Sequence, residues 1–434
     1  MLSPELAMAA GFGTLLILCL LRVPIGLSMG SAGLLGFGLV TGFDPAYKLL
    51  SHSLIATLSD YTMGLIPLFI LMGAVAVVSG ISGDLFRAAQ YWLGGFRGGL
   101  AVATVASCGG FSAICGSSAA TAATMTRVAL PEMVKQGYSE RLATGIIAAG
   151  GTLGILIPPS IALAVYGLLT QQSVGLLFMA GIIPGAVAIA LYLLTVKGWL
   201  IVRPQDAPAG QSFPWKARFG TLRKLGPILL LSVFVIGGIY GGFFTPTEAG
   251  ALGAAGTIVL TACMRLLSWN ALFRSLADSV KTAAAILLIM AGAVLFGYFL
   301  TITGTPERVT DLLMSANLGR YGTLFVIIAI LLVLGCFIDA LAVVVLVVPI
   351  VYPIVMELGF DPIWFGVIVT MSVELGLITP PFGLNVFVIK GLSKKTSIWT
   401  IYQGVTPFIL IDLVRIGLLI AFPSIILFLP NLMR

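Results

Sequence analysis

The sequence has few charged side chains: Asp, Glu, Lys and Arg make up 9% of its 434 residues, whereas 59% are hydrophobic. With a mean hydropathy of +1.12, the chain has too little polar surface to enclose one water-soluble core. Apolar runs of about 20 residues, the length that a helix needs to cross a bilayer, recur along almost the whole sequence. The sequence therefore predicts an all-α polytopic membrane protein.

Residue types that catalyse reactions or bind metals are equally scarce. His52 is the only histidine, which excludes a histidine relay or cluster, and the five cysteines show no CxxC spacing that would suggest a disulfide framework or a zinc site. No GxxxxGK[ST] motif is present, so ATP is not expected to be the direct driver. No span combines Ser with His or carries a catalytic carboxylate pair, so neither an enzyme nor a cofactor is predicted.

The first apolar run, near residues 5–21, lacks the basic start of a cleaved signal peptide and is predicted to be a retained span. Two other stretches, about 99–134 and 320–357, have small or polar residues at their middle and are predicted to be re-entrant hairpins. The remaining spans are expected near 24–42, 64–83, 140–170, 176–202, 225–243, 246–267, 282–303, 362–390 and 404–429.

The sequence has more basic than acidic residues, 23 against 16, and the orientation of the chain in the membrane explains this excess. The linker at about 203–224 carries five Lys and Arg and one acidic residue, so the positive-inside rule places it in the cytoplasm. If the spans alternate from there, 18 of the 23 face the cytoplasm, and the others are Lys48, Arg308, Arg320, Arg434 and, within the last span, Arg415. No nucleic acid partner is therefore predicted.

The chain repeats itself at an offset of 222 residues. This shift superposes Pro24 on Pro246, Pro131 on Pro353, and LGILIPPS (153–160) on LGLITPPF (375–382). An odd number of spans separates equivalent positions, so the repeats, 1–222 and 223–434, are expected to have inverted topology. Inverted repeats with interrupted helices are typical of secondary transporters, and scaffold and transport domains would be interleaved across both repeats.

The two diproline motifs interrupt membrane-length helices, at about 140–170 and 362–390. Each Pro pair removes two amide donors, and irregular backbone within the hydrocarbon persists only where it lines a cavity or binds something. Freed carbonyls at the end of a half-helix are suitable ligands for Na⁺, whereas the start of the next half-helix favours an anion. Each break therefore predicts a cation position beside an anion position.

The hairpin tips are predicted to complete these sites. Gly116, Ser117, Ser118 and Thr121 supply hydroxyl groups and close backbone approach in the first hairpin, and Asp339 aligns with Ser117 in the second. A carboxylate at membrane depth is costly, which makes Asp339 a candidate cation ligand or substrate group. Simple helix packing is the alternative for any isolated Ser or Thr.

Other polar residues leave two interpretations open. Thr379 and Asn385 flank the second break and would either contact substrate or make structural hydrogen bonds. Glu374 is either a coupling carboxylate or a backbone cap, whereas Asp412 and Arg415, at i,i+3 spacing, are predicted to form a structural ion pair. The amphipathic segments 43–62 and 268–282 are either interfacial helices or connectors.

Three segments resemble the large membrane subunit of tripartite ATP-independent periplasmic (TRAP) transporters. They are GGFSAICGSSAATAATM, PEMVKQGYSERLATGIIAAGGTLGILIPPS and ELGLITPPFGLNVF, and the likeness covers nearly the whole chain. The resemblance implies a Na⁺-driven importer of an organic acid in the bacterial inner membrane, with an elevator mechanism. It also implies a periplasmic substrate-binding protein and a small membrane subunit, here expected as a separate chain because no extra spans precede Met1.

The resemblance also maps the family's sites onto this chain, with two or more Na⁺ ions as coupling ions. In the first half they fall on Gly116, Ser117, Ser118 and Gly154 with Pro158, and in the second on Asp339, Gly376 and Thr379 with Pro380. Family substrates include dicarboxylates, sialic acids and other sugar acids. The main alternative is a stand-alone Na⁺- or H⁺-coupled anion carrier without a binding protein, and a channel is disfavoured because paired hairpins and broken helices predict an occluding site.

Overall fold

The computed structural model describes residues 2–315 and 318–433, which are folded into α-helices and two short 3-10 helices. Within these residues no strand occurs, and eight helical segments are long and apolar enough to cross a membrane. The predicted all-α, multi-pass architecture is therefore confirmed.

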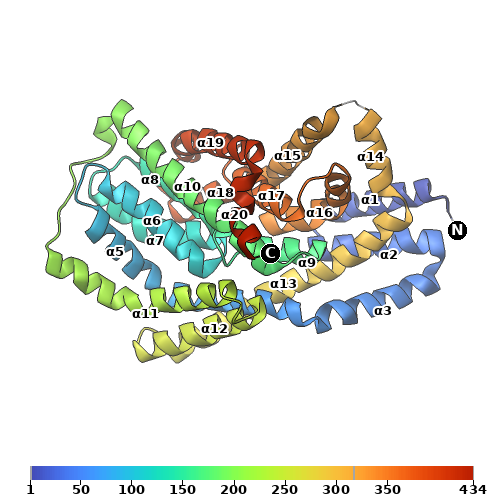
Figure 1. Ribbon diagram of the computed structural model, residues 1–434, viewed down its shortest axis with the longest axis horizontal. Coiled ribbons are helices and arrows are strands. Elements are labelled where there is room, and N and C mark those ends of the chain that lie inside the picture. The colour runs from blue at the N-terminus through green and yellow to red at the C-terminus, as the bar shows by residue number, and fades with distance from the viewer. Residues whose placement is uncertain (1, 316–317, 434) are drawn as a thin grey trace.

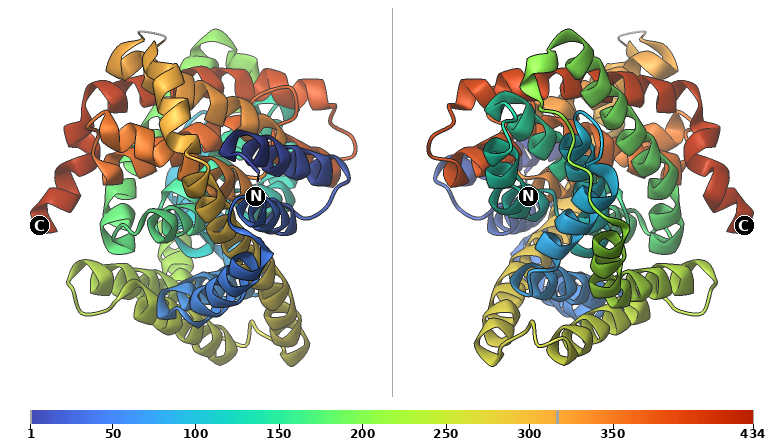
Figure 2. Two further views of the ribbon diagram at one scale, coloured as in Figure 1. Left: turned by 90° about the vertical axis from the view of Figure 1, so that its right-hand side faces the viewer. Right: turned by 90° about the vertical axis from the view of Figure 1, so that its left-hand side faces the viewer.

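The helices of the first half of the chain are α1 (Pro4–Leu20), α2 (Ile25–Thr41), α3 (Phe43–Ser59), α4 (Leu65–Val78), α5 (Ile81–Leu93), α6 (Gly99–Cys115), α7 (Ser118–Lys135), α8 (Glu140–Leu156), α9 (Ile161–Thr170) and α10 (Val174–Val202). Those of the second half are α11 (Trp215–Tyr240), α12 (Pro246–Cys263), α13 (Trp269–Ile302), α14 (Thr305–Ser315), α15 (Gly319–Phe337), α16 (Ala340–Glu357), α17 (Pro362–Gly376), α18 (Leu384–Leu392), α19 (Ile398–Ala421) and α20 (Pro423–Met433). In Figures 1 and 2, α3, α11 and α12 lie along one side of the molecule, away from α8 and α19.

Helices α6 and α7 form the first hairpin, and α15 and α16 form the second. Gly116 ends α6 with a φ of +63°, a conformation that glycine adopts without strain. Ser117 then begins α7, because its hydroxyl oxygen accepts a hydrogen bond from the amide of Ala120. Asp339 caps α16 in the same way, accepting a hydrogen bond of 3.1 Å from the amide of Leu341.

Both predicted broken helices are present. In the first repeat, α8 ends at Leu156 and α9 begins at Ile161. In the second repeat, the equivalent helix α17 ends at Gly376 and α18 begins at Leu384. The diprolines lie in the two interruptions, and the bonds Pro158–Pro159 and Pro380–Pro381 are both cis.

The repeat of 222 residues is visible in the helix boundaries themselves. The starts of α7 and α16, Ser118 and Ala340, are 222 residues apart, and so are their ends, Lys135 and Glu357. The caps of α8 and α17 also match: Ser139 accepts from the amide of Leu142, and Asp361 accepts from those of Ile363 and Trp364. Equivalent short polar residues therefore begin equivalent helices in the two halves.

Three segments differ from the sequence prediction. The amphipathic segment 268–282 is not a separate helix but the first part of the 34-residue α13, which meets no Gly or Pro before Gly292. The predicted span 404–429 divides at Phe422, because the ring of Pro423 prevents continuation of α19. The span predicted near 64–83 ends at Val78, where Gly80 with a φ of +74° leads into the amphipathic α5.

Candidate functional site

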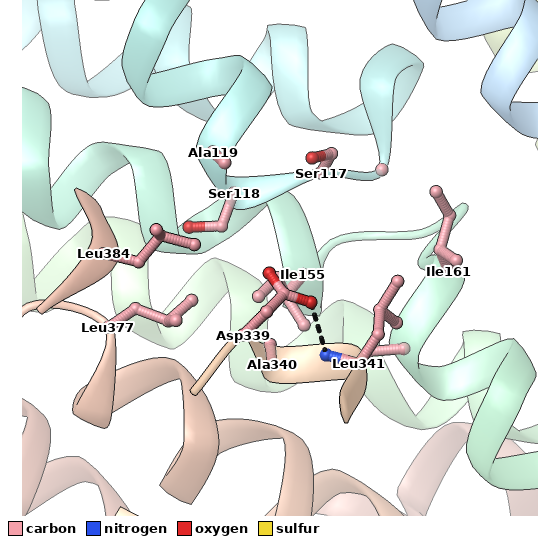
Figure 3. Close-up of a pocket in the computed structure, with 12 residues that line it drawn as sticks. Ser117, Ser118, Ala119, Ile155, Ile161, Asp339, Ala340, Leu341, Leu377 and Leu384 are labelled. Carbon is pink, nitrogen blue, oxygen red and sulfur yellow. Dashed lines mark hydrogen bonds between the residues drawn. The ribbon is translucent and has the colours of Figure 1, made fainter. Parts of the chain in front are cut away.

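A pocket of about 60 Å³ lies between the tips of the two hairpins. Figure 3 shows Ser117 and Ser118 of the first tip on one side and Asp339 and Leu341 of the second tip facing them. The starts of α9 and α18, part of α8, and Leu377 directly after α17 complete the lining. The structure thus brings together residues of both repeats that are more than 200 positions apart in the sequence, as the repeat predicts.

Four helices begin at this pocket, two from the hairpins and two from the broken helices. The first residues of α7, α9, α16 and α18, which are Ser118, Ile161, Ala340 and Leu384, all line it. The start of a helix carries unpaired amide groups and roughly half a positive charge. Four such ends each add positive potential to one small cavity, whose described lining residues include one carboxylate, Asp339, and no Lys or Arg.

The hydroxyl groups of the first tip are held in place by the second repeat. Ser118 Oγ accepts a hydrogen bond of 2.7 Å from Nδ2 of Asn385, which also lies 3.4 Å from the carbonyl oxygen of Ala148. Thr121 does not line the pocket, because its hydroxyl donates to the carbonyl of Ser117 at 2.9 Å. Asn385 is fully buried and does not line the pocket, and it makes a hydrogen bond of the structural kind that was one of its two interpretations.

Hairpin tips pack directly on the broken helices through glycine. A Cβ added to Gly154 would lie 2.6 Å from the carbonyl oxygen of Ser117, and one added to Gly116 would lie 2.6 Å from that of Pro159. In the second half, a Cβ on Gly376 would lie 2.6 Å from the carbonyl carbon of Gly335. Gly154 and Gly376 are equivalent positions of the repeat, so each tip contacts its break backbone to backbone.

The carbonyl groups freed by the two diprolines differ in their partners. Pro158 offers no amide to the carbonyl of Gly154, whose oxygen thus lacks its helical donor beside Ser117. In the second break the carbonyl of Gly376 instead accepts from the amide of Thr379, and the Thr379 hydroxyl donates to the carbonyl of Leu375 at 2.7 Å. The first break therefore has the more available cation ligand, and Pro380 lies in a turn whose carbonyls are largely paired.

A buried charged cluster extends the predicted Asp412–Arg415 ion pair. Arg415 Nη2 lies 3.1 Å from Oδ1 of Asp412 and 3.5 Å from Oε1 of Glu374, and all three side chains are inaccessible to solvent. The hydroxyl of Tyr192 on α10 donates to Oδ2 of Asp412 at 2.7 Å. Glu374 does not line the pocket, and the cluster joins α10, α17 and α19.

Sequence patterns did not identify Tyr192 as part of this cluster. It lies 220 residues from Asp412 in a helix that shows no polar pattern around it, so only the fold brings the two together.

Residues 12–425 match the family model described as "Tripartite ATP-independent periplasmic transporter, DctM component". The chain belongs to this family. It is similar to a C4-dicarboxylate TRAP transporter large permease protein of Pseudomonas aeruginosa, with 37% identity over 403 residues that cover 92% of this chain and 94% of the relative. The resemblance drawn from the three sequence segments is therefore confirmed.

A second relative is the isethionate TRAP transporter permease protein DctMQ of Oleidesulfovibrio alaskensis, 32% identical over 96% of this chain and 65% of that protein. Among solved structures, the Alcanivorax borkumensis YdaH transporter has a similar fold, with a TM-score of 0.63, 15% identity, and coverage of 96% of this chain and 99% of that one. The two sequence relatives are named as permeases, in agreement with the prediction that the DctM-family chain is a transporter and not an enzyme. The YdaH structure supports the predicted fold.

Proposed function

We propose that the chain is the large permease of a Na⁺-coupled importer of an organic acid. The observation that carries this proposal is the meeting of four helix N-termini at a pocket that has two serine hydroxyl groups, one carboxylate (Asp339) and no basic side chain. Oriented amides stabilise a carboxylate or sulfonate without a fixed Lys or Arg. A solute held in this way binds reversibly, which suits release on the far side of a membrane.

Two relatives support an anionic substrate, since one is named for C4-dicarboxylates and the other for isethionate. Dicarboxylates, sialic acids and other sugar acids are the substrate classes proposed for this chain. Ser117 and Ser118 would donate hydrogen bonds to the acid, and Asp339 on the opposite side of the pocket would accept from a hydroxyl group or help to hold a cation. Thr121, Thr379 and Asn385 would act by positioning the tip and the break, because their side chains are engaged there.

Two or more Na⁺ ions are proposed as co-transported ions beside the hairpin tips. In the first half Na⁺ would bind near Gly116, Ser117, Gly154 and Pro158, where the Gly154 carbonyl lacks a helical donor. In the second half it would bind near Asp339, Gly376, Thr379 and Pro380. A bound cation also neutralises the acid at the pocket, so the binding of ion and solute would be mutually favourable.

Membership of the family supports a proposal for the partners of the chain and for the movement of its hairpins. We infer that a periplasmic binding protein delivers the acid, that a small membrane subunit is a second partner, and that the complex resides in the bacterial inner membrane. The relative named DctMQ supports the second partner, because this chain covers only 65% of it. Hairpins and broken helices would move together against a scaffold, as in an elevator mechanism.

The test is uptake into proteoliposomes under imposed Na⁺ gradients, with a panel of organic acids and with or without candidate binding proteins and the small subunit. The proposal predicts uptake that requires Na⁺ and the binding protein. Uptake of free acid by this chain alone would instead support the alternative of a stand-alone Na⁺- or H⁺-coupled anion carrier. Uptake driven equally by K⁺ and Na⁺ gradients would contradict Na⁺ coupling.

A further inference from the structure

A second cavity, of about 430 Å³, lies between the end of α10 and the beginning of α19, outside the hairpin-tip pocket. The two helices pack side by side (Figure 1), with Gly198, Val202 and Arg203 on one wall and Gln403 and Pro407 on the other. Arg203 follows the last residue of α10 and Gln403 lies in the second turn of α19, so the guanidinium and amide occupy the same end of this groove.

The rest of the groove is apolar in character. The hydroxyls of Thr195 and Thr406 donate to carbonyl oxygens of their own helices at 2.8 Å, so both donor hydrogens are already engaged, and Pro407 and Val202 add apolar surface to the lining. A Cβ added to Gly198 would meet no atom within 4 Å, so this wall borders open space. The groove thus combines one charged end with a long apolar wall.

Arg203 has no acidic partner among the described residues. Its guanidinium lies 5.5 Å from the centre of the Trp199 ring, and the nearby carboxylate of Asp206 accepts a hydrogen bond of 2.7 Å from the indole of Trp199. Stacking on an aromatic ring leaves the N–H edges of a guanidinium free, and these edges match the oxygens of a phosphate group.

The position of the groove in the membrane indicates which phosphate-containing molecules can reach Arg203. The apolar helix Val174–Val202 ends one residue before Arg203, and Trp199 lies one turn inside this end, where tryptophan is enriched at membrane interfaces. Arg203 also begins the basic linker that the positive-inside rule places in the cytoplasm. The cytoplasmic leaflet carries the anionic headgroups that attract such residues.

We propose that this groove binds one anionic phospholipid of the cytoplasmic leaflet. Its phosphate would contact Arg203 and Gln403, and one acyl chain would lie along Gly198 and Pro407 toward the bilayer centre. The bound lipid would fill the space between α10 and α19, the two helices that also carry Tyr192 and Asp412 of the charged cluster.

The test is native mass spectrometry of the purified carrier titrated with phosphatidylglycerol or with phosphatidylcholine of the same acyl chains. We expect one phosphatidylglycerol to be retained in preference to phosphatidylcholine. Arg203→Gln is expected to weaken this binding about tenfold, the effect of losing one charge-assisted contact. Arg218→Gln is the matched control, because Arg218 also stacks on a tryptophan, at 4.8 Å from the ring of Trp215, but does not line the groove.

Gly198→Leu tests the apolar part without changing the charge, since the larger side chain would occupy the cavity. It is expected to reduce retention of phosphatidylglycerol at least as strongly as Arg203→Gln. Equal retention of both lipids by the unmodified carrier would overturn the proposal, and so would undiminished binding by both groove variants. The measurement needs no transport, so its outcome is independent of the substrate and the coupling ion.

Discussion

The side-chain amide of Asn385 in α18 donates a hydrogen bond of 2.7 Å to the hydroxyl of Ser118 at the start of α7. This contact joins the second broken helix to the tip of the first hairpin, across 267 residues of sequence. Asn385 is fully buried, whereas Ser118 is buried at the wall of the pocket. One side chain of the second repeat thus fixes the orientation of a pocket hydroxyl supplied by the first.

We expect Asn385→Ala to lower the free energy of unfolding by about 1–3 kcal/mol, because Ser118 loses its donor in a buried site. Thermal unfolding of purified Asn385→Ala, Ser118→Ala and the double variant measures the coupling. The two losses should be less than additive by about 1 kcal/mol. Strict additivity would mean that the hydrogen bond contributes nothing.

Arg415→Met is expected to destabilise the protein by about 3–5 kcal/mol, because Asp412 and Glu374 lose the only cation that contacts them in the described structure. Adding Asp412→Asn and Glu374→Gln should restore most of this stability by removing the stranded charges. The matched control is Arg308→Met, whose partner Glu5 is exposed. That change should cost less than about 1 kcal/mol. Unfolding midpoints of Arg415→Met, of the triple variant and of Arg308→Met measure these effects. If Arg415→Met cost no more than Arg308→Met, the buried cluster would not contribute to stability.

Gly154→Ala and Gly376→Ala are each expected to displace a hairpin tip, because the new Cβ would lie 2.6 Å from backbone atoms that have no side-chain freedom. We predict that the Na⁺ concentration for half-maximal uptake rises at least several-fold in both. Gly13→Ala in α1 is the control, since its Cβ meets no atom within 4 Å. That substitution should leave uptake unchanged and raise stability by about 0.5–1 kcal/mol. If Gly154→Ala and Gly376→Ala both kept the Na⁺ dependence of the unmodified chain, the helix breaks would not form part of the Na⁺ sites.

Asp339→Ala and Ser117→Ala are predicted to weaken Na⁺-dependent uptake at least tenfold while the protein still inserts and folds, because both side chains face the pocket. Proteoliposome uptake at several Na⁺ concentrations measures this, with Asp311→Ala on the exposed side of α14 as the control. If both pocket variants transported with the Na⁺ dependence of the unmodified chain, the assignment of the site would be wrong.

The hairpins, the breaks and the repeat were predictable because their signals are local. A capping Ser or Asp and two prolines each act within a few residues, and both signals recur 222 positions later. The tip glycine does not recur, because Ile338, with a φ of −123°, stands where the first hairpin has Gly116. Residues that meet only through the fold were not predictable in this way. Tyr192 reaches Asp412 across 220 residues, and Asn385 reaches Ser118 across 267, so both contacts depend on the packing of distant helices. The interpretation of Glu374 was left open for the same reason, since its partner Arg415 lies two helices further along the chain.

The glycine contacts of Gly154 with Ser117 and of Gly376 with Gly335 have a mechanical consequence. Main chain lies against main chain in both, so no rotamer change is available to loosen either junction. In the proposed elevator movement, a hairpin and the interrupted helix behind it would therefore move as a single rigid unit. The pocket between the tips would then keep its shape while it opens first to one side of the membrane and then to the other.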